Sequence, residues 1–534
     1  MKIQFPIEKA LSFRATFTKY PYLIVLLCIG LLLGSCKTTV STITSSTENV
    51  DFIVLQMNDV YEIAPLEGGK AGGLARVATI KKQLLEENPN TIAVLSGDFL
   101  SPSFIGTLKT EEGEKIAGLQ MVETLNAMGL DYATFGNHEF DISDPDLLEK
   151  RMDQSNFLYI CNNAFRNAEN GRRPFQQKRN GQIQPVQEYI IEEFSNKSGG
   201  KVKVGITGVV LPFNQQDYVH YEPVVSTFRK TYEQLKPKSD MVVALTHLAV
   251  EQDMQLAAEV PGVDLFLGGH DHSEMNHYVE NTIITKADAN AKTVYIHRIS
   301  YNPASGMSRI RSTLKTIDDS IQEDPATKAV VSIWQNKVAG IMKEMGYNPD
   351  QQVLLAKTPL ICTEAKVRTQ PTNYGTLTVE AFQAVWPDAD LYLINSGSMR
   401  LDDDISGTVT EYDVLRTFPF GGDIVRTEIP GKALPAILQT GLVTNIGQGG
   451  YLQTLNLDKK GGQWRINGTT IDPNKNYTLV LPKFLADGKE QNLEAFGEYK
   501  YTQKDKFSIG SNSIKNDIRD IVIYYMEQIK VVGE

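Results

Sequence analysis

The sequence predicts an α/β fold in which metal-binding side chains follow buried strands. Long apolar runs are typical of strands in a parallel sheet, and stretches with helical spacing alternate with them. Open α/β sheets bind ligands beyond the carboxyl ends of their strands. We therefore expect five strand ends to meet at one crevice. They are FIVLQMND ending at Asp59, TIAVLSGD at Asp98, YATFGNHE at Asn137 and His138, MVVALTH at His247, and DLFLGGHDH at His270 and His272.

Length and composition bound the class of protein. The chain has 534 residues, of which 41% are hydrophobic and 22% charged, so it is long enough for more than one core. The net charge of -11 argues against nucleic acid as a partner. Cys161 and Cys362 remain once the N-terminal cysteines are set aside, and we expect two free, buried thiols. A metal held by sulfur is excluded by this count.

The N-terminus has the pattern of a targeting segment. A basic region precedes an apolar stretch at residues 22–33, which is short for a membrane span of about 20 residues. The following Leu33-Gly34-Ser35-Cys36 resembles a bacterial lipobox, whose cysteine becomes the lipidated first residue. An ordinary membrane anchor is the alternative. We expect a signal peptide at 1–35 and a flexible tether at 36–50. A lipid on Cys36 would then hold the protein at the outer membrane, on its periplasmic or surface face.

The remaining chain divides into two predicted domains joined by a helix. An α/β domain is expected at 51–325, a connector helix at 326–348, and a second domain at 349–534. The second domain has none of the seven histidines, so we expect no transition metal there. Arg368 and Arg400 suit phosphate recognition, and its Phe and Tyr residues suit an aromatic ring.

The ligand types point to a transition metal. Imidazole together with carboxylate favours Zn, Mn or Fe over Ca or Mg. Asp98 is central in the series, and a carboxylate can bridge two cations about 3.5–4 Å apart, as in two-metal phosphoryl transfer. We expect Gly136, Gly268 and Gly269 to permit tight turns that aim side chains at the ions. Each histidine alone is typical of a hydrogen-bonded surface residue; the ordered set is specific.

With this set the sequence resembles the calcineurin-like metallophosphoesterases, and its second half narrows the resemblance to the 5′-nucleotidase family. The C-terminal motifs are N-x-G-x-x-R at 395–400, PFGG at 419–422, GGYLQ at 449–453 and LPKFLADG at 481–488. The resemblance spans about residues 51 to 500. It implies a four-layer α/β/β/α metallophosphoesterase domain, a connector helix and an α+β substrate-binding domain.

The resemblance also implies two divalent metal ions and a set of site residues. His138 and Asp141 would form the catalytic dyad, which polarises the phosphoryl group while a metal-bound hydroxide attacks. The first metal would be held by Asp59, Asp98 and His272, and the second by Asp98, Asn137, His247 and His270. Arg368, Asn395 and Arg400 would hold phosphate and nucleoside, and Phe420 would stack on the base.

Two positions depart from the family pattern. Asp-x-His is replaced by Asp59-Val60-Tyr61, so one histidine ligand is missing. Tyr61 could ligate as a phenolate, contact the ion through water, or leave that metal weakly bound. The second departure is GKEQNLEAF at 488–496. The family usually has an aromatic residue here that stacks on the base opposite the first one, so that the two rings form a clamp. Phe496 is the candidate for this second ring.

Three functions are consistent with these residues. The leading hypothesis is a lipid-anchored 5′-nucleotidase that removes phosphate from nucleotides. A relative that acts on 2′,3′-cyclic nucleotides or nucleotide sugars would use the same metal residues. A nucleotide-binding lipoprotein without catalysis is the third, although retention of Asp59, Asp98 and the His138–Asp141 pair speaks against it. The metal, the preferred base and the oligomeric state are left open.

Overall fold

The computed structural model describes residues 49–169, 171–213 and 216–533. The predicted signal peptide, Cys36 and nearly all of the tether lie outside this part, so the lipid anchor stays a prediction. No helix in the described part is long and apolar enough to span a membrane. Both remaining cysteines, Cys161 and Cys362, are free and buried, as predicted.

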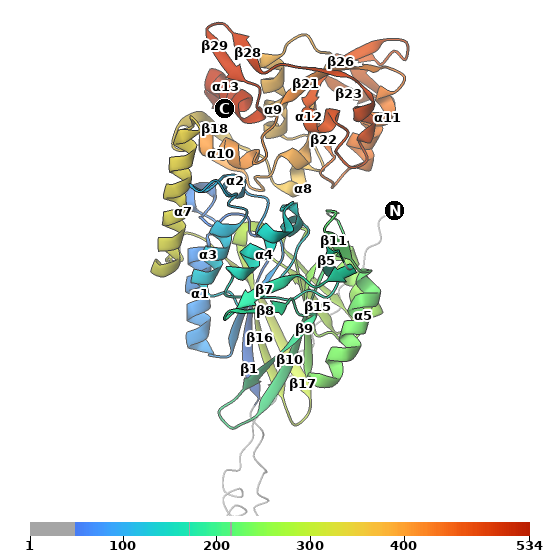
Figure 1. Ribbon diagram of the computed structural model, residues 1–534. Helices are drawn as coiled ribbons and strands as arrows, with labels where there is room; N and C mark the ends of the chain where they lie inside the picture. The colour runs from blue at the N-terminus through green and yellow to red at the C-terminus, as the bar shows by residue number, and fades with distance from the viewer. Residues whose placement is uncertain (1–48, 170, 214–215, 534) are drawn as a thin grey trace, which may run out of the picture. The chain divides into compact units, whose positions relative to one another are not determined.

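Two six-stranded sheets form the core of the first lobe, which runs from β1 to β17 (Figure 1). The first sheet has the order β17-β16-β1-β2-β3-β4 and the second β14-β15-β13-β12-β10-β9. Strands of the first are β1 (Val50–Met57), β2 (Thr91–Ser96), β3 (Tyr132–Thr134), β4 (Leu158–Tyr159), β16 (Thr293–Asn302) and β17 (Met307–Thr316). Strands of the second are β9 (Tyr189–Ser195), β10 (Lys201–Val210), β12 (Met241–His247), β13 (Leu265–Gly268), β14 (Met275–Val279) and β15 (Thr282–Lys286).

Alternating side chains along each strand build the layers. On β1, Phe52 and Val54 pack between the two sheets, whereas Ile53 and Leu55 pack on the opposite, helix-covered face. Helices α1 (Leu74–Glu87), α3 (Leu119–Met128) and α4 (Pro145–Asp153) cover the first sheet, and α5 (Val224–Leu235) and α6 (Val250–Glu259) cover the second. The four-layer α/β/β/α fold is confirmed.

The five motif strands are divided between the sheets. Strands β1, β2 and β3 are parallel neighbours in the first sheet, and β12 and β13 are parallel neighbours in the second. Small elements extend the first lobe: α2 (Phe104–Thr107), β5 (Ala164–Ala168), β6 (Gly171–Arg173), β7 (Gln176–Arg179), β8 (Gln182–Pro185) and β11 (Val219–Tyr221). The predicted ligands therefore come from the carboxyl ends of strands in two sheets rather than in one.

Helix α7 (Pro325–Glu344) follows the first lobe. The Asp324 side chain caps its start by accepting from Thr327 N–H, and proline occupies its first turn. Trp334 is buried and its indole donates to Glu123 of α3 at 2.8 Å. Trp334 is thus a packing residue.

The second lobe, from β18 to β30, combines mixed sheets with helices. Its five-stranded sheet has the order β22-β19-β26-β21-β27, and a three-stranded sheet has the order β20-β18-β30. The strands are β18 (Gln352–Leu360), β19 (Leu391–Asn395), β20 (Ile405–Thr410), β21 (Ile424–Pro430), β22 (Leu452–Leu455), β26 (Asn476–Pro482), β27 (Tyr501–Gln503) and β30 (Val531–Val532). The helices are α8 (Glu364–Val367), α9 (Asn373–Val385), α10 (Glu411–Thr417), α11 (Leu434–Gln439), α12 (Lys483–Ala486) and α13 (Ile518–Ile529).

Candidate metal centre

Four predicted ligands lie at strand ends in left-handed backbone. The φ angles are 52° at Asp59, 57° at Asp98, 84° at His270 and 58° at His272. Non-glycine residues seldom adopt this conformation, and it persists where surrounding structure imposes it. These turns direct the four side chains to one place.

The motif glycines serve a different purpose from the one predicted. Gly136, Gly268 and Gly269 are absent from the positive-φ glycines, so they do not supply the turns. A Cβ on Gly136 would lie 2.1 Å from Asp98 Oδ1, and one on Gly269 would lie 2.4 Å from the Ser96 carbonyl oxygen. Glycine is needed because neighbouring chain segments approach so closely.

The acidic and imidazole groups converge around Asp98. Its Oδ2 lies 3.1 Å from His247 Nε2, and its Oδ1 accepts from the backbone N–H of His138 at 2.7 Å. Asp59 Oδ1 lies 3.3 Å from His272 Nε2. Ligand atoms of Asp59, Asp98 and His272 all lie within 4.8 Å of one another, which suits one cation.

Unsatisfied buried atoms mark the same place. Asn137 Oδ1 has no hydrogen-bond partner, and Asp59 Oδ1 and His247 Nε2 have only their close contacts with His272 and Asp98. Buried polar atoms are rarely left unpaired, and each of these can bind a cation. His270 joins the group, with its ring centroid 5.4 Å from that of His247. The residues present fit a divalent ion bound by oxygen and nitrogen.

The electrostatics of the cluster follow from burial and close charges. Burial alone lowers the pKa of His247, but the carboxylates of Asp98 and Asp59 outweigh it and raise the pKa to about 9. Burial, and then the neighbouring His247, lower the pKa of His270 to about 3. A cation in the site would displace the proton from His247.

Glu139 is a structural residue of the site that sequence reasoning left without a role. It is fully buried, and its two oxygens accept from four backbone N–H groups, at 2.5–3.0 Å. Burial, and then Asp98, raise its pKa to about 7 despite these donors. Its position in the GNHE motif was the only signal. The four donors belong to Asp98, Phe99, Leu100 and Gly136.

Tyr61 lies inside the cluster, where the family usually has histidine. Its hydroxyl is 3.1 Å from Asp98 Oδ2 and 3.0 Å from His272 Nε2. Burial, and then Asp98, raise its pKa well above the usual value. Tyr61 thus contacts two predicted ligands, and its role toward a cation stays a prediction.

The predicted dyad is formed at the edge of the cluster. His138 Nδ1 lies 2.8 Å from Asp141 Oδ2, which also accepts from the Ser101 hydroxyl at 3.0 Å. On the other side, Arg400 Nη1 of the second lobe lies 3.3 Å from His138 Nε2. Arg400 is thus the second-lobe residue that reaches the dyad directly.

The other substrate residues of the second lobe are held by acidic neighbours. Arg368 Nη1 pairs with Glu364 at 2.5 Å, and Asn395 donates to Glu490 at 2.6 Å. Glu490 lies in the departing segment 488–496, and sequence reasoning missed both acids. Phe420 is 54% exposed, as a stacking face requires.

Phe496 does not fit a second clamp face. Its side chain is 1% exposed and packs in the core of the second lobe with Leu485 and Leu493. A buried ring cannot stack on a substrate. Among the histidines without a motif, His297 is buried and bonded to Gln56 and Ser312, which is a structural role.

Comparisons with known proteins identify the family. The model of the calcineurin-like phosphoesterases matches residues 52–274, and that of the 5′-nucleotidase C-terminal domain matches 353–498, together more than half of the chain. The 5′-nucleotidase of Bos taurus is 24% identical over 473 residues, 78% of either protein. The trifunctional nucleotide phosphoesterase protein YfkN of Bacillus subtilis is 26% identical over 446 residues, and the chain spans 28% of its length.

A solved structure of a 5′-nucleotidase precursor from Thermus thermophilus shares the fold, with a TM-score of 0.72 at 20% identity, over 90% of this chain and 97% of that one. The two family matches place the chain among the calcineurin-like phosphoesterases, which are hydrolases of phosphoester bonds. Its C-terminal half makes the assignment narrower: the chain belongs to the 5′-nucleotidase family.

Proposed function

We propose that the protein removes phosphate from nucleotides at a site that binds two divalent cations, Zn, Mn or Fe. The observation that supports this most is the contact between Arg400 and His138, because it joins a phosphate-binding group to the dyad beside the acid–histidine cluster. Asp59, Asp98 and His272 would hold one cation, and Asp98, Asn137, His247 and His270 the other. When bound, the ions would activate water and stabilise charge on the phosphoryl oxygens.

The dyad supplies proton transfer and orientation. Asp141 holds His138 through Nδ1, so Nε2 is the nitrogen that faces the reacting group. A phosphoryl oxygen placed between His138 and Arg400 would interact with both. Arg400 Nε also donates to Gly397 O at 2.8 Å, which fixes its guanidinium before substrate enters.

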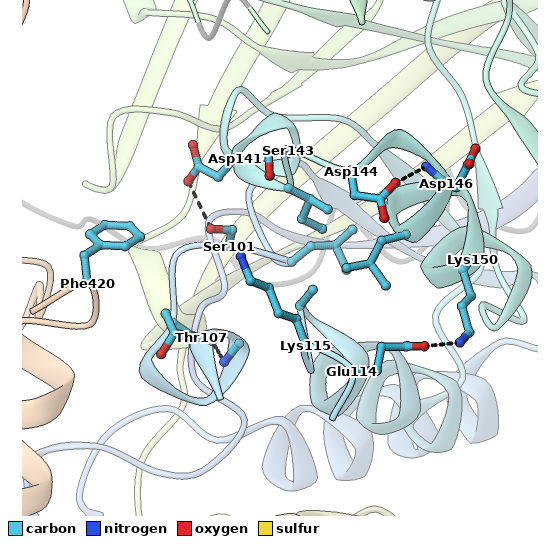
Figure 2. Close-up of a pocket in the computed structure, with 16 residues that line it drawn as sticks. Ser101, Thr107, Glu114, Lys115, Asp141, Ser143, Asp144, Asp146, Lys150 and Phe420 are labelled. Atoms are coloured by element: carbon cyan, nitrogen blue, oxygen red, sulfur yellow. Dashed lines mark hydrogen bonds and ion pairs between the residues drawn. The ribbon is translucent and has the colours of Figure 1, made fainter. Parts of the chain in front are cut away.

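A cavity of about 640 Å³ lies beside the dyad and suits the nucleoside (Figure 2). Figure 2 shows Phe420 at its edge, across from Ser101 and Asp141, whose side chains are hydrogen-bonded to each other. Four carboxylates line it, from Glu114, Asp141, Asp144 and Asp146, against two lysines. This excess of negative charge favours an uncharged base and sugar over a further phosphate. Phe420 would stack on the base.

Phosphate release from AMP by the full-length protein tests the proposal. We expect hydrolysis that requires added Zn²⁺ or Mn²⁺ and that falls about 100- to 10,000-fold in His138→Ala, because the dyad acts in the transition state. His220→Ala, which changes a histidine far from the cluster in sequence and outside its contacts, is the control. A preference for 2′,3′-cyclic AMP or a nucleotide sugar over AMP would overturn the substrate class but keep the metal centre.

A further inference from the structure

The two histidines that approach the Asp59–Asp98 pair differ in what holds their second ring nitrogen. His247 Nδ1 is 2.8 Å from the backbone carbonyl of Ser96, which belongs to its own lobe. His272 Nδ1 is instead 2.8 Å from Asp402 Oδ2, a side chain 130 positions away in the second lobe. Because the two residues belong to different lobes, the contact exists only when both lobes are folded and packed together.

Asp402 is itself held on every side. Its Oδ1 accepts from the backbone N–H of Glu364 at 2.8 Å, and its carbonyl oxygen accepts from Lys292 Nζ at 2.9 Å. The residue has φ of 53° and its side chain is 8% exposed. A left-handed, buried aspartate with three partners is a rigid acceptor rather than a chance surface contact.

We propose that Asp402 is a positioning residue that completes the first metal position from the substrate-binding lobe. A metal-binding imidazole usually donates its other N–H to a carboxylate or carbonyl, which fixes the ring and makes the ligand atom more basic. Asp402 does this for His272, and so directs Nε2 toward Asp59, 3.3 Å away. The inference rests on the metal centre of the proposed function.

The local sequence explains why this position needs the support. The family's histidine is replaced by Tyr61, and a phenol hydroxyl is a weaker ligand than an imidazole, so His272 carries more of the binding. Arg400 precedes Asp402 by two residues on the same loop.

Zn²⁺ binding by the metal-free, full-length protein tests the role without reference to activity. Competition with a chromophoric chelator should give two sites in the parent chain. In Asp402→Ala one site should weaken about 10- to 100-fold, the usual effect of losing such a partner, and the other should stay unchanged. Asp404→Ala is the matched control, since that neighbour faces Lys366 and Cys362 rather than His272.

A spectroscopic signature separates positioning from general stability. In the Zn²⁺-loaded parent, the Nδ1 proton of His272 should give a slowly exchanging imidazole NMR signal that Asp402→Ala removes and Asp404→Ala keeps. Two parent-like sites in Asp402→Ala would overturn the inference and leave the proposed function intact. Weakening of both sites together would overturn it as well, because it would assign Asp402 to folding. Failure of the parent to take up Zn²⁺ would overturn the metal centre itself.

Discussion

The two sides of the metal cluster are built on different principles. The side around His247 is made entirely within the first lobe: Ser96 orients the imidazole, and Glu139 gathers four backbone N–H groups from the adjoining loops. The side around His272 is open to the second lobe, which contributes Asp402 at 2.8 Å and Glu364 at 3.6 Å. One side is preorganised by its own lobe, whereas the other depends on lobe contact.

In the proposed function, this difference links chemistry to substrate capture. The lobe that carries Arg400 and Phe420, the proposed substrate-binding residues, also carries Asp402. Preorganised groups lower the cost of reaching the transition state.

Asp98 contacts residues on both sides of the cluster, so its loss should weaken metal binding on both sides. Asp98→Asn should lower Zn²⁺ uptake at both positions and reduce AMP hydrolysis on the order of 1,000-fold or more, about 4 kcal/mol of transition-state stabilisation. Metal content and turnover give the measurement. His272→Ala should affect mainly one position. Two fully occupied sites in Asp98→Asn would contradict the bridging role.

Glu139 tests the self-contained side. In Glu139→Gln, one amide oxygen must serve donors that two carboxylate oxygens serve now, and the NH₂ group faces other N–H groups. We expect the free energy of unfolding to fall by about 3 kcal/mol, measured by urea denaturation, with weakened metal uptake. Glu86→Gln, an exposed change on α1, should be neutral. Equal stability of the two variants would remove Glu139 from this role.

Phe420 tests the contribution of the second lobe to substrate binding. Phe420→Ala should raise KM for AMP by an amount corresponding to about 1–3 kcal/mol of lost stacking. Cleavage of bis(p-nitrophenyl) phosphate, which lacks a nucleoside, should change little. Phe484→Ala removes another exposed ring, one outside the cavity, and should leave both substrates unaffected. A parallel loss on both substrates would argue against stacking.

Replacement of Tyr61 should strengthen metal binding on the His272 side. Tyr61→His restores an imidazole beside His272 and should tighten Zn²⁺ at the first position about tenfold, or about 1.4 kcal/mol. It should also make that position less sensitive to Asp402→Ala, which a double-mutant cycle would measure. Tyr61→Phe, which removes the hydroxyl without adding a ligand, is the control. Weaker Zn²⁺ binding in Tyr61→His would show that the tyrosine is the better partner.

Local sequence patterns were sufficient to predict the fold class and to locate the candidate ligands at strand ends. Each ligand directly follows its strand, so local chain order puts Asp59, Asp98 and His247 at strand ends whatever the rest of the chain does. The free thiols were predicted as well, because Cys161 and Cys362 fall in different predicted domains. Residue types alone indicated a transition metal and a phosphate-binding second lobe.

The contacts that hold the candidate ligands in place become visible only in the folded chain. The roles of Glu139 and Asp402 depend on contacts about 40 and 130 positions apart in the chain, which no local pattern encodes. Gly136 and Gly269 proved to be needed for close approach rather than for turns, because the clashing atoms come from other strand ends. Phe496 was drawn into the core of its lobe, away from the substrate side, since burial of an aromatic ring outweighs its place in a motif.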